Sequence, residues 1–196
     1  MSTEFNEMQQ LKRKLFAMRN GVVADTLRKA GCPHRIVFGL NLPQLNEIAA
    51  SMIPSADLAE RLRADTNLRE SALLAPMLYP VAELTYEKAR QWALTTMWHE
   101  DADILCFKLL RHTPFAGRLA AELCAAPDSA PLARYTGLRL YFNLVSKLPV
   151  EALEAARSEL QRPQPLSTLA SMLAEEAAFL TDTHIDSTES DMPHRP

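Results

Sequence analysis

The chain has 196 residues, of which 47% are hydrophobic and 23% are charged, and its formal net charge is −3. This length fits one domain with a single large core, and the composition is that of an ordinary globular protein. No apolar run approaches the roughly 18 residues that cross a bilayer, and the N-terminus lacks the apolar centre of a signal peptide. The sequence therefore predicts a cytoplasmic protein without a membrane span.

Capping residues mark the starts of several expected helices. Ser55 follows Pro54 and is a good N-cap for one helix, and Thr66 is a good N-cap for the next. Thr85 opens the segment YEKARQWALTTMW. The apolar run RIVFGL, residues 35–40, contains β-branched residues, but its flanks indicate a loop or a helix start rather than a strand.

Apolar residues recur at three- and four-residue steps in nearly every periodic segment, which indicates amphipathic helices. We expect about ten or eleven helices joined by short polar turns, and hence an all-α fold. Helix pairs recur at roughly 35 to 45 residues, which is typical of an α-α superhelix of HEAT-like helical repeats. An irregular globular bundle is the alternative that this periodicity leaves open.

The two ends of the chain differ in charge. Residues 1–150 carry 18 Lys and Arg against 15 Asp and Glu, whereas residues 151–196 carry 3 against 9. We expect a HEAT-like α-solenoid domain over residues 1–180 and an acidic disordered tail over residues 181–196, which read TDTHIDSTESDMPHRP after Leu180. The mildly basic body permits contact with phosphate groups but does not require it.

An acid-rich turn, TMWHEDADILC, precedes an apolar helix. In this helix Asp103 shares one face with Phe107 and Leu110, where apolar side chains are expected. A carboxylate in the first turn can simply favour the positive end of the helix dipole. The alternative is that Asp103 faces a concave surface, where it can stabilise a cation.

Trp98 and His99 stand at the entry to the same helix. Trp98 is either a contact for a sugar or base or a hydrophobic staple. Histidine side chains titrate near neutral pH, so His99 is a candidate general acid or base, or else a surface or capping residue. The three cysteines and the scattered histidines lack the spacing of metal ligands, and we expect no metal site and no cofactor.

Three stretches together resemble the DNA alkylation repair family of HEAT-like repeat proteins, the AlkD-like alkylpurine DNA glycosylases. They are VFGLNLPQLNEIA from Val37, LRESALLAPMLYP from Leu68 and WHEDADILC from Trp98, followed by ARYTGLRLYFNL. The family shows an FGV-x-x-P-x-LR-x-IA segment, an E-x-x-x-x-A-x-x-ML helix and a tryptophan-rich turn that ends in an aspartate. The resemblance covers about residues 37 to 145.

This resemblance implies an α-solenoid whose concave basic surface holds double-stranded DNA. It also implies hydrolysis of the N-glycosidic bond of cationic bases such as 3-methyladenine and 7-methylguanine, without drawing the base into a pocket. Asp103 matches the family's aspartate and would stabilise positive charge on the sugar. The other residues that the resemblance or the basic pattern suggests as DNA contacts are Trp98, His99, Lys108, Arg134, Tyr135 and Arg139.

The chain departs from the family pattern at four places. His99 stands where a second aromatic residue is usual, Tyr135 where a second basic residue is frequent, and Asn46 where an arginine is usual. No tryptophan follows Trp98. We therefore keep a second hypothesis, a non-catalytic helical-repeat scaffold that binds protein or nucleic acid. In either case we expect a monomer.

Overall fold

The computed structural model describes residues 2–189, and it describes the side chains of residues 7–182. All regular secondary structure in this part of the chain is helical, apart from an isolated bridge between Ile36 and Leu68, which confirms the predicted all-α fold. The chain divides into two compact units, Met1–Thr85 and Tyr86–Pro196. The single domain over residues 1–180 and the curved superhelix stay predictions.

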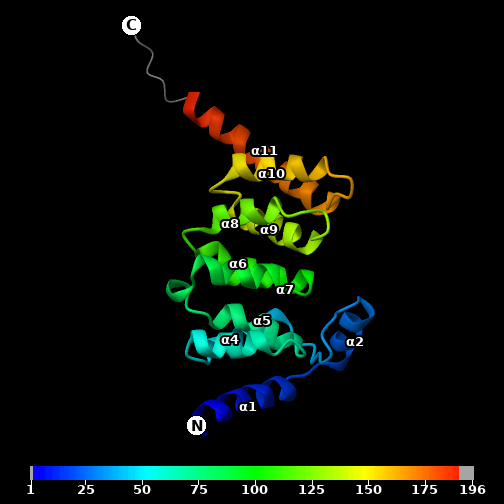
Figure 1. Ribbon diagram of the computed structural model, residues 1–196, viewed down its shortest axis with the longest axis vertical. Coiled ribbons are helices and arrows are strands. Elements are labelled where there is room, and N and C mark those ends of the chain that lie inside the picture. The colour runs from blue at the N-terminus through cyan, green and yellow to red at the C-terminus, as the bar shows by residue number, and fades with distance from the viewer. Residues whose placement is uncertain (1, 190–196) are drawn as a thin grey trace. The chain divides into compact units, whose positions relative to one another are not determined.

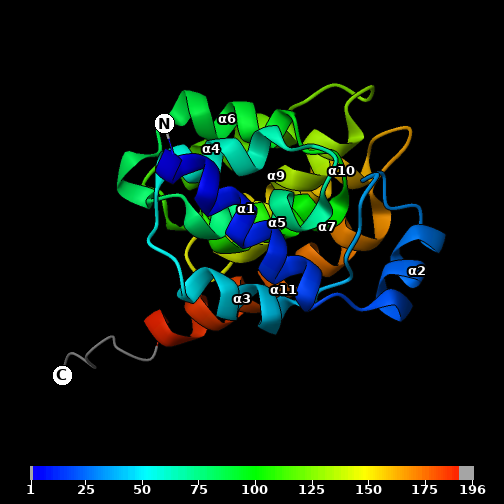
Figure 2. The same ribbon diagram turned by 90° about the horizontal axis from the view of Figure 1, so that it is seen from below.

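Three helices of unit 1, the first of these units, begin at residues whose side chains cap them, namely Asn20, Asn41 and Ser55. In α4 the Ser55 hydroxyl accepts the backbone N–H of Leu58 at 3.3 Å, which confirms the predicted cap. Helices α4 and α5 lie side by side, and α3 also packs on α5 (Figures 1 and 2). The helices described in unit 1 are α1 (Ser2–Ala17), α2 (Gly21–Lys29), α3 (Leu42–Ala50), α4 (Ala56–Ala64), α5 (Arg69–Leu78) and the short 3-10 helix Val81–Glu83.

Helix α5 begins later than the sequence suggests. The predicted N-cap, Thr66, is wrong, because the actual N-cap is Leu68. The Ile36 N–H donates to the Asn67 carbonyl at 2.8 Å, and the Arg69 N–H donates to the Ile36 carbonyl at 3.0 Å. This pairing keeps the backbone extended just before Arg69. The contact with the distant residue Ile36 therefore makes α5 begin later in the chain than Thr66 would suggest.

The RIVFGL segment is a loop, and a buried carboxylate holds it in place. Glu70, which is fully buried at the start of α5, accepts the backbone N–H groups of Phe38, Gly39 and Leu40 at 3.1, 2.9 and 3.3 Å. Arg69 donates to the same carboxylate at 2.8 Å. Buried backbone N–H groups require partners, and this one side chain supplies them in place of a strand neighbour.

Unit 2 consists of three successive layers of helices, namely α6 with α7, α8 with α9 and α10 with α11 (Figure 1). A buried apolar seam joins α8 to α9, and another joins α10 to α11. The helices described in unit 2 are α6 (Tyr86–Leu94), α7 (His99–Lys108), the 3-10 helix Leu110–His112, α8 (Ala116–Cys124), α9 (Pro131–Leu144), α10 (Pro149–Leu160) and α11 (Ser167–Glu189).

Helix α9 is the centre of unit 2, because it packs against α6, α7, α8, α10 and α11. It begins with Pro131 at a first-turn position, where proline's missing N–H costs nothing. Burial on several sides explains why its apolar pattern is weak, since a helix surrounded by neighbours needs no single apolar stripe. Three polar side chains of α9 donate to other helices, namely Arg134, Tyr135 and Arg139, whereas Thr136 and Asn143 donate to carbonyl groups of α9 itself.

The boundary predicted for the acidic tail differs from the structure. Helix α11 continues beyond residue 180 and ends at Glu189, so residues 181–189 of the expected disordered tail are helical. Residues 190–196 of that prediction lie outside the described residues. Alanine, leucine and glutamate have high helix propensity and are frequent in the first part of α11. The helix that they favour extends into the polar segment that composition alone assigns to a tail. Among the described residues, no helix is both long enough and apolar enough to cross a membrane.

Candidate functional site

The acid-rich turn forms the start of α7. Trp98 is the N-cap residue with extended backbone angles, φ −149° and ψ 161°, and its side chain makes no capping hydrogen bond. Asp103 lies beyond the first turn of this helix. The side chain of Asp103 thus does not cap its own helix, and it is 31% exposed rather than sealed in the core.

The Asp103 carboxylate is held from α9 by two residues. Its Oδ1 atom accepts the Tyr135 hydroxyl at 2.9 Å and Arg139 Nε at 2.6 Å. Its Oδ2 atom accepts Arg139 Nη2 at 3.2 Å. This fork of two N–H groups on one carboxylate is the strong geometry for an arginine–carboxylate pair, and it fixes the orientation of all three groups.

This arrangement also sets the protonation of the donors. The hydrogen bond to Asp103 raises the pKa of the Arg139 guanidinium. Burial, followed by the charge of Asp103, raises the pKa of the Tyr135 phenol. Tyr135 therefore stays a hydrogen-bond donor at neutral pH, and Asp103 serves as the acceptor for both partners.

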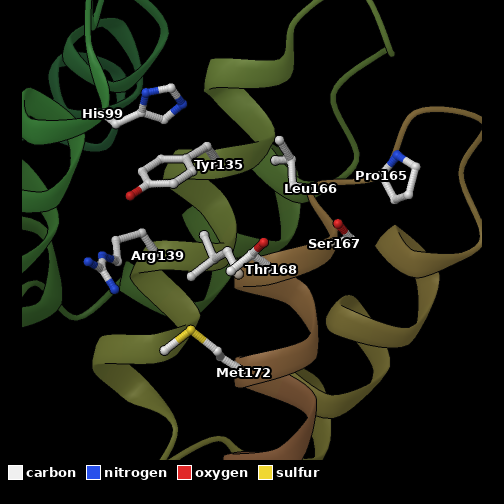
Figure 3. A pocket seen from close by; sticks show the side chains of 9 residues that line it. His99, Tyr135, Arg139, Pro165, Leu166, Ser167, Thr168 and Met172 are labelled. Carbon is white, nitrogen blue, oxygen red and sulfur yellow. The ribbon is translucent and has the colours of Figure 1, made fainter. Parts of the chain in front are cut away.

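A cavity of about 490 Å³ lies beside this cluster (Figure 3). Its volume is within the range that small-molecule sites in proteins occupy. The cavity is lined by His99 from α7, Tyr135 and Arg139 from α9, and residues from the start of α11 and the segment before it, namely Pro165, Leu166, Ser167, Thr168, Leu169 and Met172.

The α7 and α9 side of the cavity is polar, whereas the α11 side combines apolar side chains with the hydroxyl groups of Ser167 and Thr168 (Figure 3). On the polar side the His99 and Tyr135 rings meet edge to face, with centroids 4.5 Å apart and planes at 80°. Arg139 lies next to Tyr135 and supplies a positive charge, whereas Leu166 and Met172 lie across the cavity (Figure 3). Such a lining suits a ligand that combines an anionic group with a flat or apolar part.

Arg134 takes no part in this cavity, which contradicts its predicted phosphate contact. The side chain is 1% exposed, and its Nε atom donates to Glu159 of α10 at 3.1 and 3.3 Å. Its other nitrogens donate to the carbonyls of Pro127 and Gln164. The guanidinium is thus committed to holding α9, α10 and the adjoining loops together.

Two further predicted DNA contacts lie away from the cavity lining. Trp98 is half-buried at the N-cap of α7. Lys108 is nine residues beyond His99, which places it about half a turn around the helix from His99. Its Nζ atom lies 5.2 Å from the ring centroid of Phe107. The structure therefore brings together His99, Asp103, Tyr135 and Arg139 from the predicted set.

The α11 side of the cavity is what the sequence analysis missed. Asp103 and Arg139 are 36 residues apart, which matches the period predicted for the helix pairs. Met172, which lines the cavity from α11, follows Arg139 by 33 residues. This step is slightly shorter than the predicted period of 35 to 45 residues, so the period was only an approximate signal for this part of α11.

The donors around the cavity suit an anion rather than a cation such as a metal ion. Within the described residues, no group of three or more His, Cys, Asp or Glu side chains could hold a metal. Comparison of the chain with protein-family models, with curated proteins and with solved structures gives no match.

Proposed function

We propose that the chain binds the sugar–phosphate backbone of double-stranded DNA at the cavity between α9 and α11, and that it hydrolyses the N-glycosidic bond of cationic alkylated purines. The observation that carries the proposal is the Asp103 carboxylate, which accepts hydrogen bonds from Tyr135 and Arg139, two residues that line this cavity together with His99. The resemblance to alkylpurine DNA glycosylases rests on the same segment. A cytoplasmic location and a monomeric state belong to the proposal.

In this proposal Arg139 has two partners in succession. In the unbound chain its guanidinium neutralises Asp103. A DNA phosphate that enters the cavity offers the guanidinium a second acceptor of the same bidentate kind, because arginine pairs with phosphate as it does with carboxylate. As the phosphate draws N–H donors from Asp103, the negative charge of the carboxylate is no longer paired with the guanidinium and can act on the bound sugar.

The reaction then needs little covalent assistance from the protein. When the C1′–N bond breaks, its electron pair goes to the purine, and a cationic alkylated purine leaves as a neutral base. The positive charge that remains develops on the sugar, where a nearby carboxylate stabilises it electrostatically. Water adds its oxygen to C1′ and releases a proton. Tyr135 keeps the carboxylate oriented while Arg139 holds the phosphate.

A glycosylase assay on duplex DNA that contains 7-methylguanine tests this proposal. The chain should release free 7-methylguanine, and Asp103→Asn should lower the rate about 100-fold, as removal of a charge-stabilising group does. Glu100→Gln is the matched control, because it removes the same charge from the same helix one turn earlier and should leave the rate unchanged. If Asp103→Asn releases 7-methylguanine as fast as the unmodified chain does, Asp103 has no catalytic role.

The second candidate function is a non-catalytic helical-repeat scaffold for nucleic acid or protein. The observation in its favour is the same ion pair, since a carboxylate already neutralised by Arg139 has less charge to offer a developing cation. The scaffold would bind DNA without releasing bases, or would bind no DNA at any salt concentration. Binding to phosphates must weaken as salt rises, so a salt titration of duplex binding separates these outcomes.

A further inference from the structure

Unit 1 contains a second cavity, which the proposed function does not use. It has a volume of about 560 Å³ and lies between α1, α2 and the loop that precedes α3. Two arginines, Arg19 and Arg28, contribute to its wall. The rest of the lining is small or apolar and comprises Ala17, Gly21, Ala24, Ile36, Val37 and Phe38. The cavity thus pairs positive charge with an apolar surface.

The two arginines are held in place by backbone carbonyl groups. Arg19 donates to the Phe16 carbonyl at 2.9 Å, and its guanidinium carbon lies 3.9 Å from the Phe16 ring centroid. Arg28 donates to the Val37 carbonyl at 3.3 Å and to Asp25 at 3.0 Å. Each of these contacts occupies some of the five N–H donors of a guanidinium and leaves the others for a ligand.

The wall between the arginines is rigid. The Asn20 N–H donates to the Phe38 carbonyl at 2.7 Å, and Glu70 holds the N–H groups of Phe38 and Gly39 from behind. Gly39 has φ +79°, and a Cβ at this position would lie 2.3 Å from the Asn20 carbonyl oxygen. Only glycine allows the loop to approach α2 so closely. The cavity is therefore formed before any ligand arrives.

The segment that forms this cavity is rich in positive charge, and the Glu70 carboxylate behind the wall is paired with Arg69. Residues 8–46 contain seven Lys and Arg and a single acidic residue, Asp25. Such a local excess of positive charge attracts anions, and the attraction is screened by salt. Because arginine recognises phosphate through paired N–H donors, phosphate is the anion that this arrangement fits best.

We infer that this cavity binds a phosphate group attached to a flat aromatic body, the chemistry of a nucleotide. Arg19 and Arg28 hold the phosphate, and the body rests on the apolar surface of Ala17, Ile36 and Phe38. The same chemistry occurs in a free nucleotide and in the 5′-phosphate end of a nucleic-acid strand. The site is separate from the cluster around Asp103 and does not depend on the proposed function.

Calorimetric titration of the full chain tests this inference with four probes. These are adenosine monophosphate, inorganic phosphate, and one oligonucleotide with and without a 5′-phosphate. Adenosine monophosphate should bind at least tenfold more tightly than inorganic phosphate, because only the nucleotide uses the apolar surface. If the phosphorylated oligonucleotide binds more tightly than both its unphosphorylated form and adenosine monophosphate, the ligand is a strand end. If adenosine monophosphate binds more tightly than the phosphorylated oligonucleotide, the ligand is a free nucleotide.

Variants separate binding at this cavity from general attraction to basic surface. Arg19→Gln and Arg28→Gln should each weaken binding at least tenfold, whereas Arg13→Gln, an exposed arginine of α1 outside the cavity lining, should not. Asp25→Asn should strengthen binding about twofold to threefold, since it removes the carboxylate that competes for Arg28. A loss of fold would not produce this gain.

A further variant tests the apolar half of the cavity. Ala17→Phe at the exposed end of α1 should block adenosine monophosphate while leaving the helical circular dichroism signal unchanged. The inference is overturned if adenosine monophosphate binds no more tightly than inorganic phosphate, or if Arg19→Gln and Arg28→Gln bind it as the unmodified chain does.

Discussion

Arg134 and Arg139 leave the same helix, α9, in different directions and have different surroundings. Arg134 is buried against Glu159 of α10, whereas Arg139 is 30% exposed and forks onto Asp103 of α7. Five residues on a helix correspond to a rotation of about 140°, which sends the two side chains to different neighbours. One arginine therefore stabilises the fold, and the other remains available to a ligand.

Replacement of Arg134 should destabilise unit 2. Arg134→Met removes one of the two arginines that hold the buried Glu159 carboxylate, which keeps Arg162 Nε at 3.2 Å and the Leu166 N–H at 2.9 Å. We therefore expect a loss of about 1–3 kcal/mol in the free energy of unfolding. Urea unfolding of the variant and of the unmodified chain gives the difference in the free energy of unfolding. A loss below about 1 kcal/mol would mean that Glu159 is satisfied without Arg134.

The pair of Asp103 and Arg139 should contribute much less to stability. Both side chains are close to one-third exposed, and such ion pairs contribute about 1 kcal/mol or less because water competes for them. A double-mutant cycle of Asp103→Asn and Arg139→Gln should give a small coupling in the free energy of unfolding. A coupling as large as the effect of Arg134→Met would assign the pair to the fold rather than to ligand binding.

Part of the pH dependence of stability should depend on His112, at the end of the 3-10 helix Leu110–His112. Burial lowers the pKa of this imidazole, and the nearby positive charges of Arg111, Lys147 and Lys108 lower it further. Because the folded-state pKa is below the ordinary value of 6.5, the unfolded chain binds more protons between these two values. The free energy of unfolding should therefore rise with pH across that window and level off above 6.5.

Thermal melting at a series of pH values from about 5 to 8 measures this effect, since the window lies at and below the ordinary pKa of histidine. His112→Gln removes the titrating group and should flatten the curve in that range. If stability rises with pH equally in the unmodified chain and in His112→Gln, another titrating group controls this pH dependence.

Gly137 should tolerate no side chain where α9 packs on α8. A Cβ at this position would lie 2.7 Å from the Cys124 nitrogen and 2.8 Å from its Sγ. Gly137→Ala should lower the free energy of unfolding by about 1–3 kcal/mol, since overpacking forces the two helices apart. Gly21→Ala is the control, because a Cβ there meets no atom within 4 Å. A neutral Gly137→Ala would show that the contact between α8 and α9 adjusts freely.

The local sequence by itself determined the helical character of the chain. The three- and four-residue spacing of apolar residues and the cap at Ser55 are short-range features, and the structure of the described residues agrees with them. The sequence also identified Asp103 as a candidate site residue, because an acid on an apolar stripe is unusual. His99 and Tyr135 became candidates through the resemblance to alkylpurine DNA glycosylases, and Arg139 through the recurring basic residues. These four side chains lie close together.

The roles of the two arginines on α9 were decided by tertiary structure alone. Arg134 and Arg139 are the same residue type on the same helix. Arg134 is structural because Glu159, 25 residues away, and the carbonyls of Pro127 and Gln164 surround its guanidinium. The start of α5 was likewise set by the distant Ile36. The burial of a charge depends on which helices surround it, and that arrangement comes from packing over the whole unit rather than from neighbouring residues in the chain.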